Sequence, residues 1–274
     1  MRFEIFQDSQ IGARTSNQDR MGYCFTRDAL LLLLADGMGG HLLGEVAATL
    51  ALQTISALFQ QKAQQTITDP SQLLDALIFA AHQELHRYRA INRLPDTPRT
   101  TIVVCLVQHG KALWAHCGDS RLYWLRSGQI LARTRDHSHI ERLIAQGRVS
   151  PALRTTHPDR NKLFNCLGAP SLPRVEKAPA VLLKPGDQLL LCSDGLWGSI
   201  ADHQLAYRLC AQKLEQALPE LVHAATVVAG KTGDNVTALA MNWLGDEPLA
   251  QSGAMQTTRL FAGSVLTTID AAAR

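Results

Sequence analysis

Four aspartates occur where an apolar, strand-like segment meets a glycine turn: Asp36, Asp119, Asp194 and Asp234. A lone aspartate beside glycine is most often an ordinary turn residue. Four of them in the same setting are harder to explain in that way. Divalent cations such as Mg²⁺ and Mn²⁺ prefer oxygen ligands and keep several waters, so a few carboxylates and a backbone carbonyl are enough to bind them. The pattern therefore predicts a site for hard divalent cations.

The first of these aspartates follows an uninterrupted apolar run, residues 31–35. A strand of this composition is expected to be buried on both faces, and Asp36 at its end then needs a partner for its charge. Gly37, Gly39 and Gly40 lack a Cβ and can bring the backbone close to an ion or a phosphate. By itself the stretch fits a plain strand-to-helix connection with a solvated aspartate equally well. The other three aspartates favour the cation.

The elements that would position these residues come in blocks. The chain begins with segments typical of strands. Two long segments with amphipathic helical patterns follow, and further strand-like segments come after them. The predicted ranges are 3–7, 21–26 and 30–35 for the first strands, 43–59 and 73–88 for the helices, and 100–108, 112–117, 121–125 and 129–133 for the later strands. Tight turns between the later strands imply antiparallel pairing. Blocks of this kind favour an α+β protein with helices packed outside antiparallel sheets.

The second half contains a less regular segment and a tail. Residues 137–170 carry one short helical pattern around 140–146 and several prolines, which is typical of a surface flap. Residues 245–274 have little periodicity, so we expect a mobile extension with a short helix near 266–273. The remaining elements complete a domain of residues 1–244: strands at 175–183, 187–192 and 235–243, and helices at 202–211 and 214–229.

Composition limits the possible partners and cofactors. The 274 residues carry a net charge of +3 without a basic tract, so neither nucleic acid nor an anionic membrane is suggested. The six cysteines form no CxxC pair and indicate buried free thiols in a reducing compartment, not a zinc cluster or a disulfide framework. The sequence shows neither a signal-like N-terminus nor a membrane-spanning run, so we expect a cytoplasmic protein without a membrane segment.

The glycine-flanked aspartates belong to an ordered set of motifs that runs from Gly12 to about Trp243. The motifs are Gly12-x-Arg14-x-x-Asn17-x-Asp19, Ala35-Asp36-Gly37-Met38-Gly39-Gly40-His41, Gly118-Asp119-Ser120-Arg121, Arg135-Asp136-His137-Ser138, Leu167-Gly168, Gly186-Asp187, Ser193-Asp194-Gly195-Leu196 and Gly233-Asp234-Asn235-Val236-Thr237. This set resembles the metal-dependent protein phosphatases of the protein phosphatase 2C (PPM) family, in their bacterial serine/threonine branch. The resemblance implies a four-layer αββα sandwich, in which helices flank two antiparallel β-sheets, with a metal centre at one end and the flap as an insertion.

The resemblance implies a role for each acid of the centre. Asp36 would bridge two metal ions, and Gly37 would supply a backbone carbonyl to one of them. Asp194 and Asp234 would hold the other metal ion. The implied cofactors are two or three Mn²⁺ or Mg²⁺ ions.

Three further residues of the motifs have implied roles. Asp19 would bind a metal-bound water, Asp119 would bind the third metal ion found in many bacterial members, and Arg14 would bind the phosphate. These roles agree with simple chemistry, because a guanidinium can hold two phosphate oxygens in a bidentate fork. A water shared by two cations loses a proton near neutral pH and can attack phosphorus in line. Positioning and charge stabilisation then carry most of the catalysis.

Two positions depart from familiar forms of the family's pattern. Gln18 stands where an acid usually precedes Asp19, so we expect weaker metal binding. Met38 stands where the eukaryotic branch has a histidine, as is common in the bacterial branch. The proton donor to the leaving group is therefore left open between His41 and a metal-bound water.

Two other groups have a plain explanation. His82 and His86 flank Glu84 on a predicted helix, but a zinc-protease helix has glutamate directly after its first histidine. We therefore interpret the two histidines as part of a polar helix face. Asp136 and Ser138 fit an N-cap of the following helix as well as a role at the hinge of the flap.

The resemblance implies hydrolysis of phosphoserine and phosphothreonine in proteins by a water that bridges the metal ions. The expected partners are phosphorylated proteins and a serine/threonine kinase that the enzyme opposes, and we expect a monomer. Three alternatives stay open: a pseudo-enzyme that binds phosphoproteins without turnover, a regulatory phosphatase acting on an anti-sigma-factor antagonist, and a metal-dependent nuclease or other phosphodiesterase. The first is disfavoured because Arg14, Asp36, Asp194 and Asp234 are all present, and the last because a basic stripe is lacking.

Overall fold

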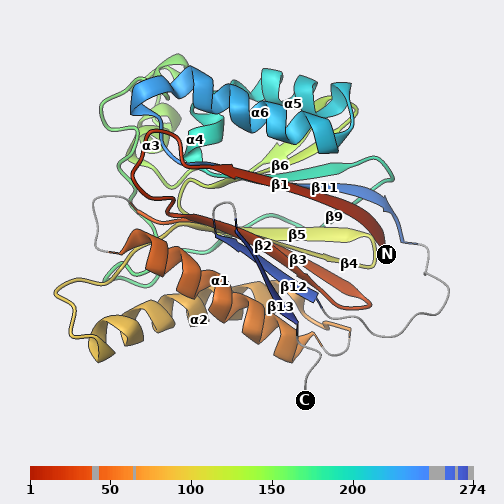
Figure 1. Ribbon diagram of the computed structural model, residues 1–274, viewed down its shortest axis with the longest axis horizontal. Helices are drawn as coiled ribbons and strands as arrows, with labels where there is room; N and C mark the ends of the chain where they lie inside the picture. The colour runs from red at the N-terminus through yellow and green to blue at the C-terminus, as the bar shows by residue number, and fades with distance from the viewer. Residues whose placement is uncertain (39–42, 64–65, 247–256, 263–264, 271–274) are drawn as a thin grey trace.

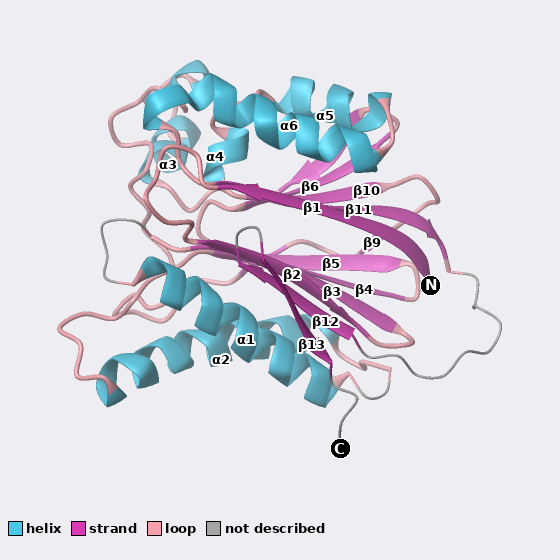
Figure 2. Ribbon diagram, in the orientation of Figure 1, coloured by secondary structure: helices cyan, strands magenta, loops and turns pink. Residues whose placement is uncertain are grey.

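The computed structural model describes residues 1–38, 43–63, 66–246, 257–262 and 265–270. Two antiparallel β-sheets lie face to face, and helices cover the outer face of each (Figures 1 and 2). The expected four-layer αββα sandwich is therefore confirmed. The expectations for Gly39, Gly40 and His41 concern residues outside the described ranges.

One sheet has the strand order β1-β11-β10-β6-β7. Its strands are β1 (Arg2–Gln10), β6 (Arg121–Arg126), β7 (Gln129–Arg133), β10 (Gln188–Cys192) and β11 (Val236–Gly245). Its outer face, at the top of Figure 1, is covered by α5 (Asp202–Ala211) and α6 (Leu214–Ala229), which leads into the 3-10 helix η2 (Gly230–Thr232). A short helix that the sequence patterns do not predict, α4 (Asp194–Trp197), begins close after β10.

The second sheet has the strand order β13-β12-β2-β3-β4-β5-β8, and β9 also pairs with β5. Its strands are β2 (Asp19–Phe25), β3 (Ala29–Asp36), β4 (Ile102–Gln108), β5 (Lys111–Cys117), β8 (Glu176–Lys177), β9 (Val181–Leu182), β12 (Thr257–Ala262) and β13 (Val265–Asp270). Its outer face is covered by the long helices α1 (Gly44–Lys62) and α2 (Pro70–Ile91). Asp69 caps α2 by accepting a hydrogen bond from the Gln72 N–H at 2.9 Å.

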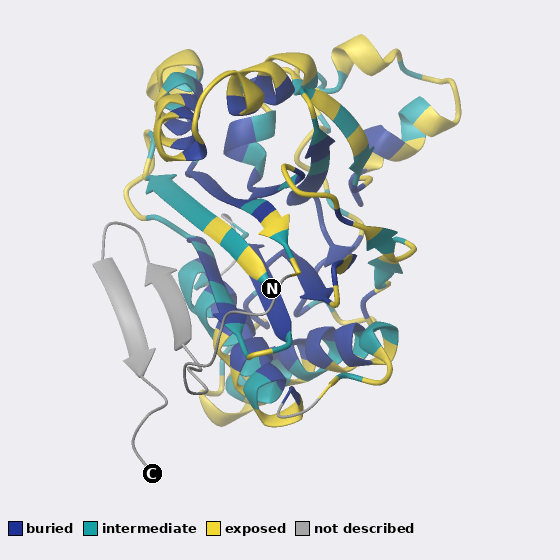
Figure 3. Cartoon of the chain, turned by 90° about the vertical axis from the view of Figure 1, so that its right-hand side faces the viewer, coloured by how far each residue is buried: buried dark blue, intermediate teal, exposed yellow. Residues whose placement is uncertain are grey.

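Strand β3 is apolar throughout because both of its faces are buried. Leu31 and Leu33 belong to the core that α1 and α2 form with this sheet. Leu30, Leu32 and Leu34 belong to the core between the two sheets. Successive side chains of a strand point to opposite faces, so β3 serves two cores at once. Figure 3 shows the buried residues, in dark blue, along the inner strands and on the helices beside them.

The flap connects β7 to β8 and contains α3 (His139–Ala145) and the 3-10 helix η1 (Pro151–Leu153). Ser138 caps α3, because its hydroxyl accepts a hydrogen bond from the Glu141 N–H at 3.3 Å. The N-cap explanation for Ser138 is therefore confirmed.

Two expectations about elements need correction. The strand expected over 175–183 is formed only as the two short strands β8 and β9. The helix expected near 266–273 is absent over 265–270, where the chain is strand β13. Strand β12 pairs with β2, whose backbone would otherwise be an open edge, and the β-branched residues of 265–269 favour a strand over a helix. The division into a domain of 1–244 and an extension of 245–274 stays a prediction.

The structure tests two expectations from composition, one about the cysteines and one about membrane-spanning helices. All six cysteines are free, but Cys210 is exposed, which corrects the expectation that all would be buried. It lies near the end of α5, a helix with one face toward solvent. Within the described ranges, no helix is long and apolar enough to cross a membrane.

Candidate metal centre

The pairing of β2 with β3 brings the first two acids together. Asp19 begins β2 and Asp36 ends β3, and the two residues lie directly opposite each other in the antiparallel register. Asp19 is 2% exposed. Since both strands belong to the same sheet, this end of the sheet presents two carboxylates side by side.

The other sheet supplies the next two acids. Asp194 is the first residue of α4 and follows Ser193, and Asp234 comes shortly before β11. The Ser193 hydroxyl donates a hydrogen bond to Asp19 Oδ2 at 2.7 Å, and the Ser193 N–H donates to the Thr237 carbonyl at 3.0 Å. Ser193 therefore ties the ends of the two sheets together at the place where the acids meet.

The electrostatics show that these carboxylates share one site. Burial raises the pKa of Asp36 well above its ordinary value, and the charges of Asp19, Asp194, Asp119 and Asp234 raise it further. The pKa of Asp194 is likewise raised, first by burial and then by the neighbouring acids. Burial also raises the pKa of Asp119 to about 7 and that of Asp19 to about 6. Buried carboxylates that repel one another need a cation to be stable in their charged forms.

The donor atoms fit hard divalent cations. Asp19 Oδ1 is enclosed and has no hydrogen-bond partner in the part of the chain that the structure describes. Carboxylate oxygens are the ligands that Mg²⁺ and Mn²⁺ prefer. The acids expected from the sequence, Asp19, Asp36, Asp119, Asp194 and Asp234, thus form one oxygen-rich site of the right chemistry.

Two threonines that sequence reasoning missed hold Asp36 in place. The Thr101 N–H donates to the Asp36 carbonyl at 2.8 Å, and the Asp36 N–H donates to the Thr101 hydroxyl at 2.9 Å. The Thr100 hydroxyl donates to the same carbonyl at 2.8 Å. The backbone of Asp36 is therefore fixed by the segment that leads into β4, and the Thr-Thr pair in that segment is the signal that could have revealed it.

Gly37 is required for a reason other than backbone freedom. A Cβ at this position would lie 2.2 Å from the carbonyl oxygen of Gly44, the first residue of α1. The glycine therefore lets α1 begin in contact with the end of β3. Its expected use as a carbonyl ligand stays a prediction.

Arg14 lies at the rim of the acid cluster. Its Nη2 donates to Asp234 Oδ2 at 2.6 Å, and its side chain is 49% exposed. The hydrogen bond and charge of Asp234 raise the pKa of Arg14, and the charges of Asp194 and Asp36 add to this effect. An exposed guanidinium beside the cluster is well placed to receive an anion from solvent.

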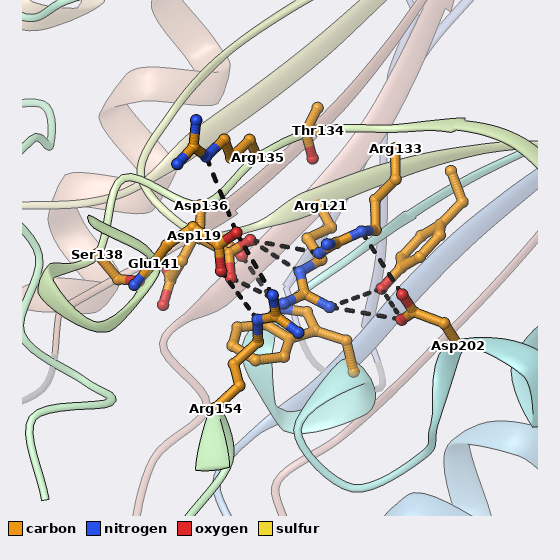
Figure 4. Close-up of polar contacts among 12 residues, drawn as sticks. Asp119, Arg121, Arg133, Thr134, Arg135, Asp136, Ser138, Glu141, Arg154 and Asp202 are labelled. Atoms are coloured by element: carbon orange, nitrogen blue, oxygen red, sulfur yellow. Dashed lines mark hydrogen bonds and ion pairs between the residues drawn. The ribbon is translucent and has the colours of Figure 1, made fainter. Parts of the chain in front are cut away.

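A buried ion pair supports the backbone of Asp119 through Trp197. Arg121 forms a bidentate pair with Asp136, with hydrogen bonds of 2.8 and 2.7 Å, and both side chains are buried (Figure 4). The Arg121 guanidinium lies 3.7 Å above the ring of Trp197, whose indole N–H donates to the Asp119 carbonyl at 2.9 Å. Asp136 therefore supports Asp119 through Arg121 and Trp197, and its role at the hinge of the flap stays a prediction.

A second cluster of potential ligands is held together by hydrogen bonds. His116, His137 and Glu176 bring ligand atoms within 4.8 Å of one another. The backbone N–H of Gly118 donates to His137 Nδ1 at 3.2 Å, so the neutral ring carries its proton on Nε2, which faces Glu176 at 3.3 Å. Burial lowers the pKa of His137 to about 4, which keeps the ring neutral. The ring nitrogens of His137 are thus engaged in hydrogen bonds that link this cluster to the start of the flap.

The two helix histidines also have structural contacts. His82 is buried, and its Nδ1 accepts a hydrogen bond from the Gly168 N–H at 3.2 Å. His86 Nε2 lies 3.0 Å from the Ala169 carbonyl. The interpretation as a polar helix face was therefore wrong, because these side chains attach the end of the flap to α2.

Gln18 directs its side chain away from a ligand role. Its side-chain amide donates to Glu45 of α1 at 3.2 Å, and its backbone carbonyl accepts a hydrogen bond from the Gly37 N–H at 3.1 Å. The position that usually carries an acid thus contributes packing between β2, β3 and α1.

Comparison with known proteins defines the class. The sequence profile described as protein phosphatase 2C matches residues 6–229, so the chain belongs to the protein phosphatase 2C family. The resemblance seen in the motifs is thereby confirmed.

Relatives and solved structures agree with this result. The chain is 29% identical over 228 residues to a putative protein phosphatase 2C-type of Streptococcus pyogenes, covering 82% of this chain and 90% of that protein. It is 31% identical over 227 residues to the serine/threonine protein phosphatase PstP of Mycobacterium tuberculosis, again covering 82% of this chain but only 42% of PstP.

The fold is shared with two solved phosphatase structures. The structure of Stp1 from Staphylococcus aureus superposes with a TM-score of 0.80 at 28% identity, covering 89% of this chain and 96% of that one. The catalytic domain of PstP in complex with two manganese ions superposes with a TM-score of 0.75 at 27% identity, covering 89% of this chain and 99% of that one.

Proposed function

We propose that this member of the protein phosphatase 2C family hydrolyses phosphoserine and phosphothreonine in proteins at the acid cluster. The observation that carries the proposal is the convergence of five aspartates from both sheets on one site, with Arg14 at its rim. Family membership and the serine/threonine phosphatases among its relatives support it.

The acids would divide the work of holding the cations. Asp36, with the Gly37 carbonyl, and Asp194 and Asp234 would hold two Mn²⁺ or Mg²⁺ ions, which lower the pKa of water and offset the charge on the phosphoryl oxygens. Asp119 would hold a third ion, and Asp19 would accept a hydrogen bond from a water of the centre. The manganese-bound structure of PstP supports the choice of metal.

Arg14 would bind and orient the phosphoryl group. Its present partner, Asp234, can be exchanged for two phosphate oxygens, because the guanidinium is half exposed and presents its donors as a fork. An arginine in this place raises the local concentration of the phosphorylated residue and aligns the phosphorus with the attacking water.

The enzyme would act on phosphorylated proteins in the cytoplasm, as a monomer, and would oppose a serine/threonine kinase of the same cell. Residues 1–244 would form the catalytic unit. A pseudo-enzyme that only binds phosphoproteins is the competing proposal, and turnover separates the two.

The test is phosphate release from a phosphothreonine peptide by Mn²⁺-loaded protein, with metal binding followed by calorimetry. We expect turnover by the wild-type protein and the loss of both turnover and Mn²⁺ binding in Asp36→Asn. Asp28→Asn removes an aspartate that pairs only weakly with Arg27 and serves as the control. Bound metal without phosphate release in the wild-type protein would instead establish the pseudo-enzyme.

A further inference from the structure

A pocket of about 520 Å³ lies between the metal centre and the flap. Met38 and Arg99 form one wall, and residues 161–166 and 169–171 of the flap form the other. Neither wall belongs to the acid cluster itself. The pocket is therefore a separate feature that a bound substrate would meet beside the reacting phosphoryl group.

The first wall is continuous with the metal centre. Met38 lies two residues after Asp36, and its N–H donates to the Arg99 carbonyl at 3.0 Å. Thr100 and Thr101, which follow Arg99, are the residues that fix the backbone of Asp36. A peptide whose phosphorylated residue lies over Asp36 therefore has its neighbouring residues at the mouth of this pocket.

The second wall is preformed. Asn165 donates to the Arg174 carbonyl at 2.8 Å and lies 2.7 Å from His137 Nδ1, so hydrogen bonds fix its side chain. The Ala169 carbonyl is held by His86. The Phe164 ring is 41% exposed and carries the Arg142 guanidinium at 4.2 Å from its centre. A pocket with such walls can bind a ligand without the free-energy cost of ordering the flap.

The charge of the pocket is opposite to that of the neighbouring acid cluster. Its lining contains Arg99 and Lys162 and, over the described ranges, no acidic residue. Lys162 is paired with Asp159 at 2.7 Å and is largely exposed. Arg99 is the stronger candidate for a ligand contact, because its side chain is only 22% exposed and its acidic partner, Asp96, lies 3.2 Å away and is half exposed.

The Arg99 guanidinium has one N–H group without a partner among the residues that the structure describes. This group is the enclosed Nε. Burial raises the pKa of the Cys166 thiol, a residue of the opposite wall, to about 11, and the charge of Arg99 opposes this rise. The guanidinium thus influences the interior of the pocket as well as its surface.

We propose that this pocket receives an acidic side chain of the phosphoprotein, close in sequence to the phosphorylated residue, and that Arg99 determines this specificity by binding its anionic group. The inference rests on the proposed function and adds a substrate class to it. A carboxylate of Asp or Glu and the phosphate of a second phosphorylated residue share the required chemistry. A lysine at position 99 would keep the charge but lose the bidentate fork.

The experiment compares kcat/KM of Mn²⁺-loaded protein on four phosphothreonine peptides. The first has neutral neighbours, the second has glutamates before the phosphothreonine, the third has glutamates after it, and the fourth carries a second phosphothreonine. We expect the wild-type protein to prefer the best acidic peptide over the neutral one by about fivefold, as for a partly exposed ion pair. The preference should shrink as the salt concentration rises, because the charges are reached by solvent.

Variants assign the preference to a residue. Arg99→Gln should reduce it to about one, and Arg99→Lys should keep part of it. Arg148→Gln is the matched control, because Arg148 is an exposed arginine of the flap that does not line the pocket. An undiminished preference in Arg99→Gln, or equal use of all four peptides by the wild-type protein, would overturn the proposal.

A binding measurement separates this inference from the proposed function. Fluorescence anisotropy of the same labelled peptides reports the preference for acidic neighbours even where no phosphate is released. Failure to release phosphate from any peptide or from an aryl phosphate would refute the proposed function. An Arg99-dependent preference in binding would still support the pocket, and its absence there would refute it.

Discussion

Replacing Asp136 by asparagine should destabilise the protein strongly, because it breaks the buried ion pair behind Asp119. The side chains of Arg121 and Asp136 are 2% and 1% exposed. Removing one partner of such a pair leaves a buried charge without compensation and typically costs about 3–5 kcal/mol. Arg121 keeps the Tyr123 hydroxyl at 2.9 Å and Asp202 at 3.5 Å. We therefore expect the lower end of the range, about 3 kcal/mol.

Thermal unfolding followed by calorimetry measures this cost. For a domain of this size, about 3 kcal/mol lowers Tm by roughly 6–12 °C. Asp202→Asn is the control, because the Asp202 side chain is 41% exposed and lies at 3.5 Å from Arg121, so that its loss should cost less than about 1 kcal/mol. Equal melting temperatures for the two variants would refute the view that Asp136 is the main partner of Arg121.

Three further predictions concern the metal centre. In the metal-free protein the folded-state pKa values of Asp119 and Asp19 lie above the ordinary value of 3.8. The folded state therefore holds protons that the unfolded state has lost. The free energy of unfolding should fall as the pH rises from 3.8 through about 7. Melting in chelator should therefore be higher at pH 5 than at pH 8, and Mn²⁺ should remove the difference; a higher melting temperature at pH 8 in chelator would contradict this. Gly37→Ala should lower both Tm and Mn²⁺ affinity, because its Cβ would lie 2.2 Å from a carbonyl oxygen of α1, whereas Gly147→Ala, which meets nothing within 4 Å, should cost only the strain of its positive φ, about 1 kcal/mol. Arg14→Ala should raise KM for a phosphopeptide by about tenfold or more with a smaller effect on kcat, and steady-state kinetics with unchanged constants would show that Arg14 does not hold the phosphate.

The acids could be located from the sequence because each is marked locally. An apolar run that ends in Asp36 predicts a buried strand with a carboxylate at its end, and the short connection to the previous strand places Asp19 opposite it. In the structure the charges of Asp19, Asp194 and Asp234 act on Asp36, and the use of these residues as metal ligands stays a prediction.

The supports of the acids could not be predicted in the same way, because they join segments that are distant in sequence. The need for glycine at position 37 comes from the approach of α1, and the pairing of Arg121 with Asp136 depends on how the flap leaves β7. His82 was misinterpreted because its partner is a backbone N–H of the flap, 86 residues away. Strand β12 adds to β2 across an even longer interval, which local propensity does not encode.

With the proposed role of the acids, the Ser193 bridge and the origin of the acids from both sheets would make cation binding and sheet docking one equilibrium. Contacts that bring the two sheets together at this end also bring the aspartate side chains together. By reciprocity, a cation bound to these aspartates would stabilise the packing of the two sheets. A substitution in the core between the sheets, such as at Trp243 near the far end of β11, would then change metal affinity without touching a ligand. Divalent cations bound at these acids would in turn add to the stability of the folded molecule.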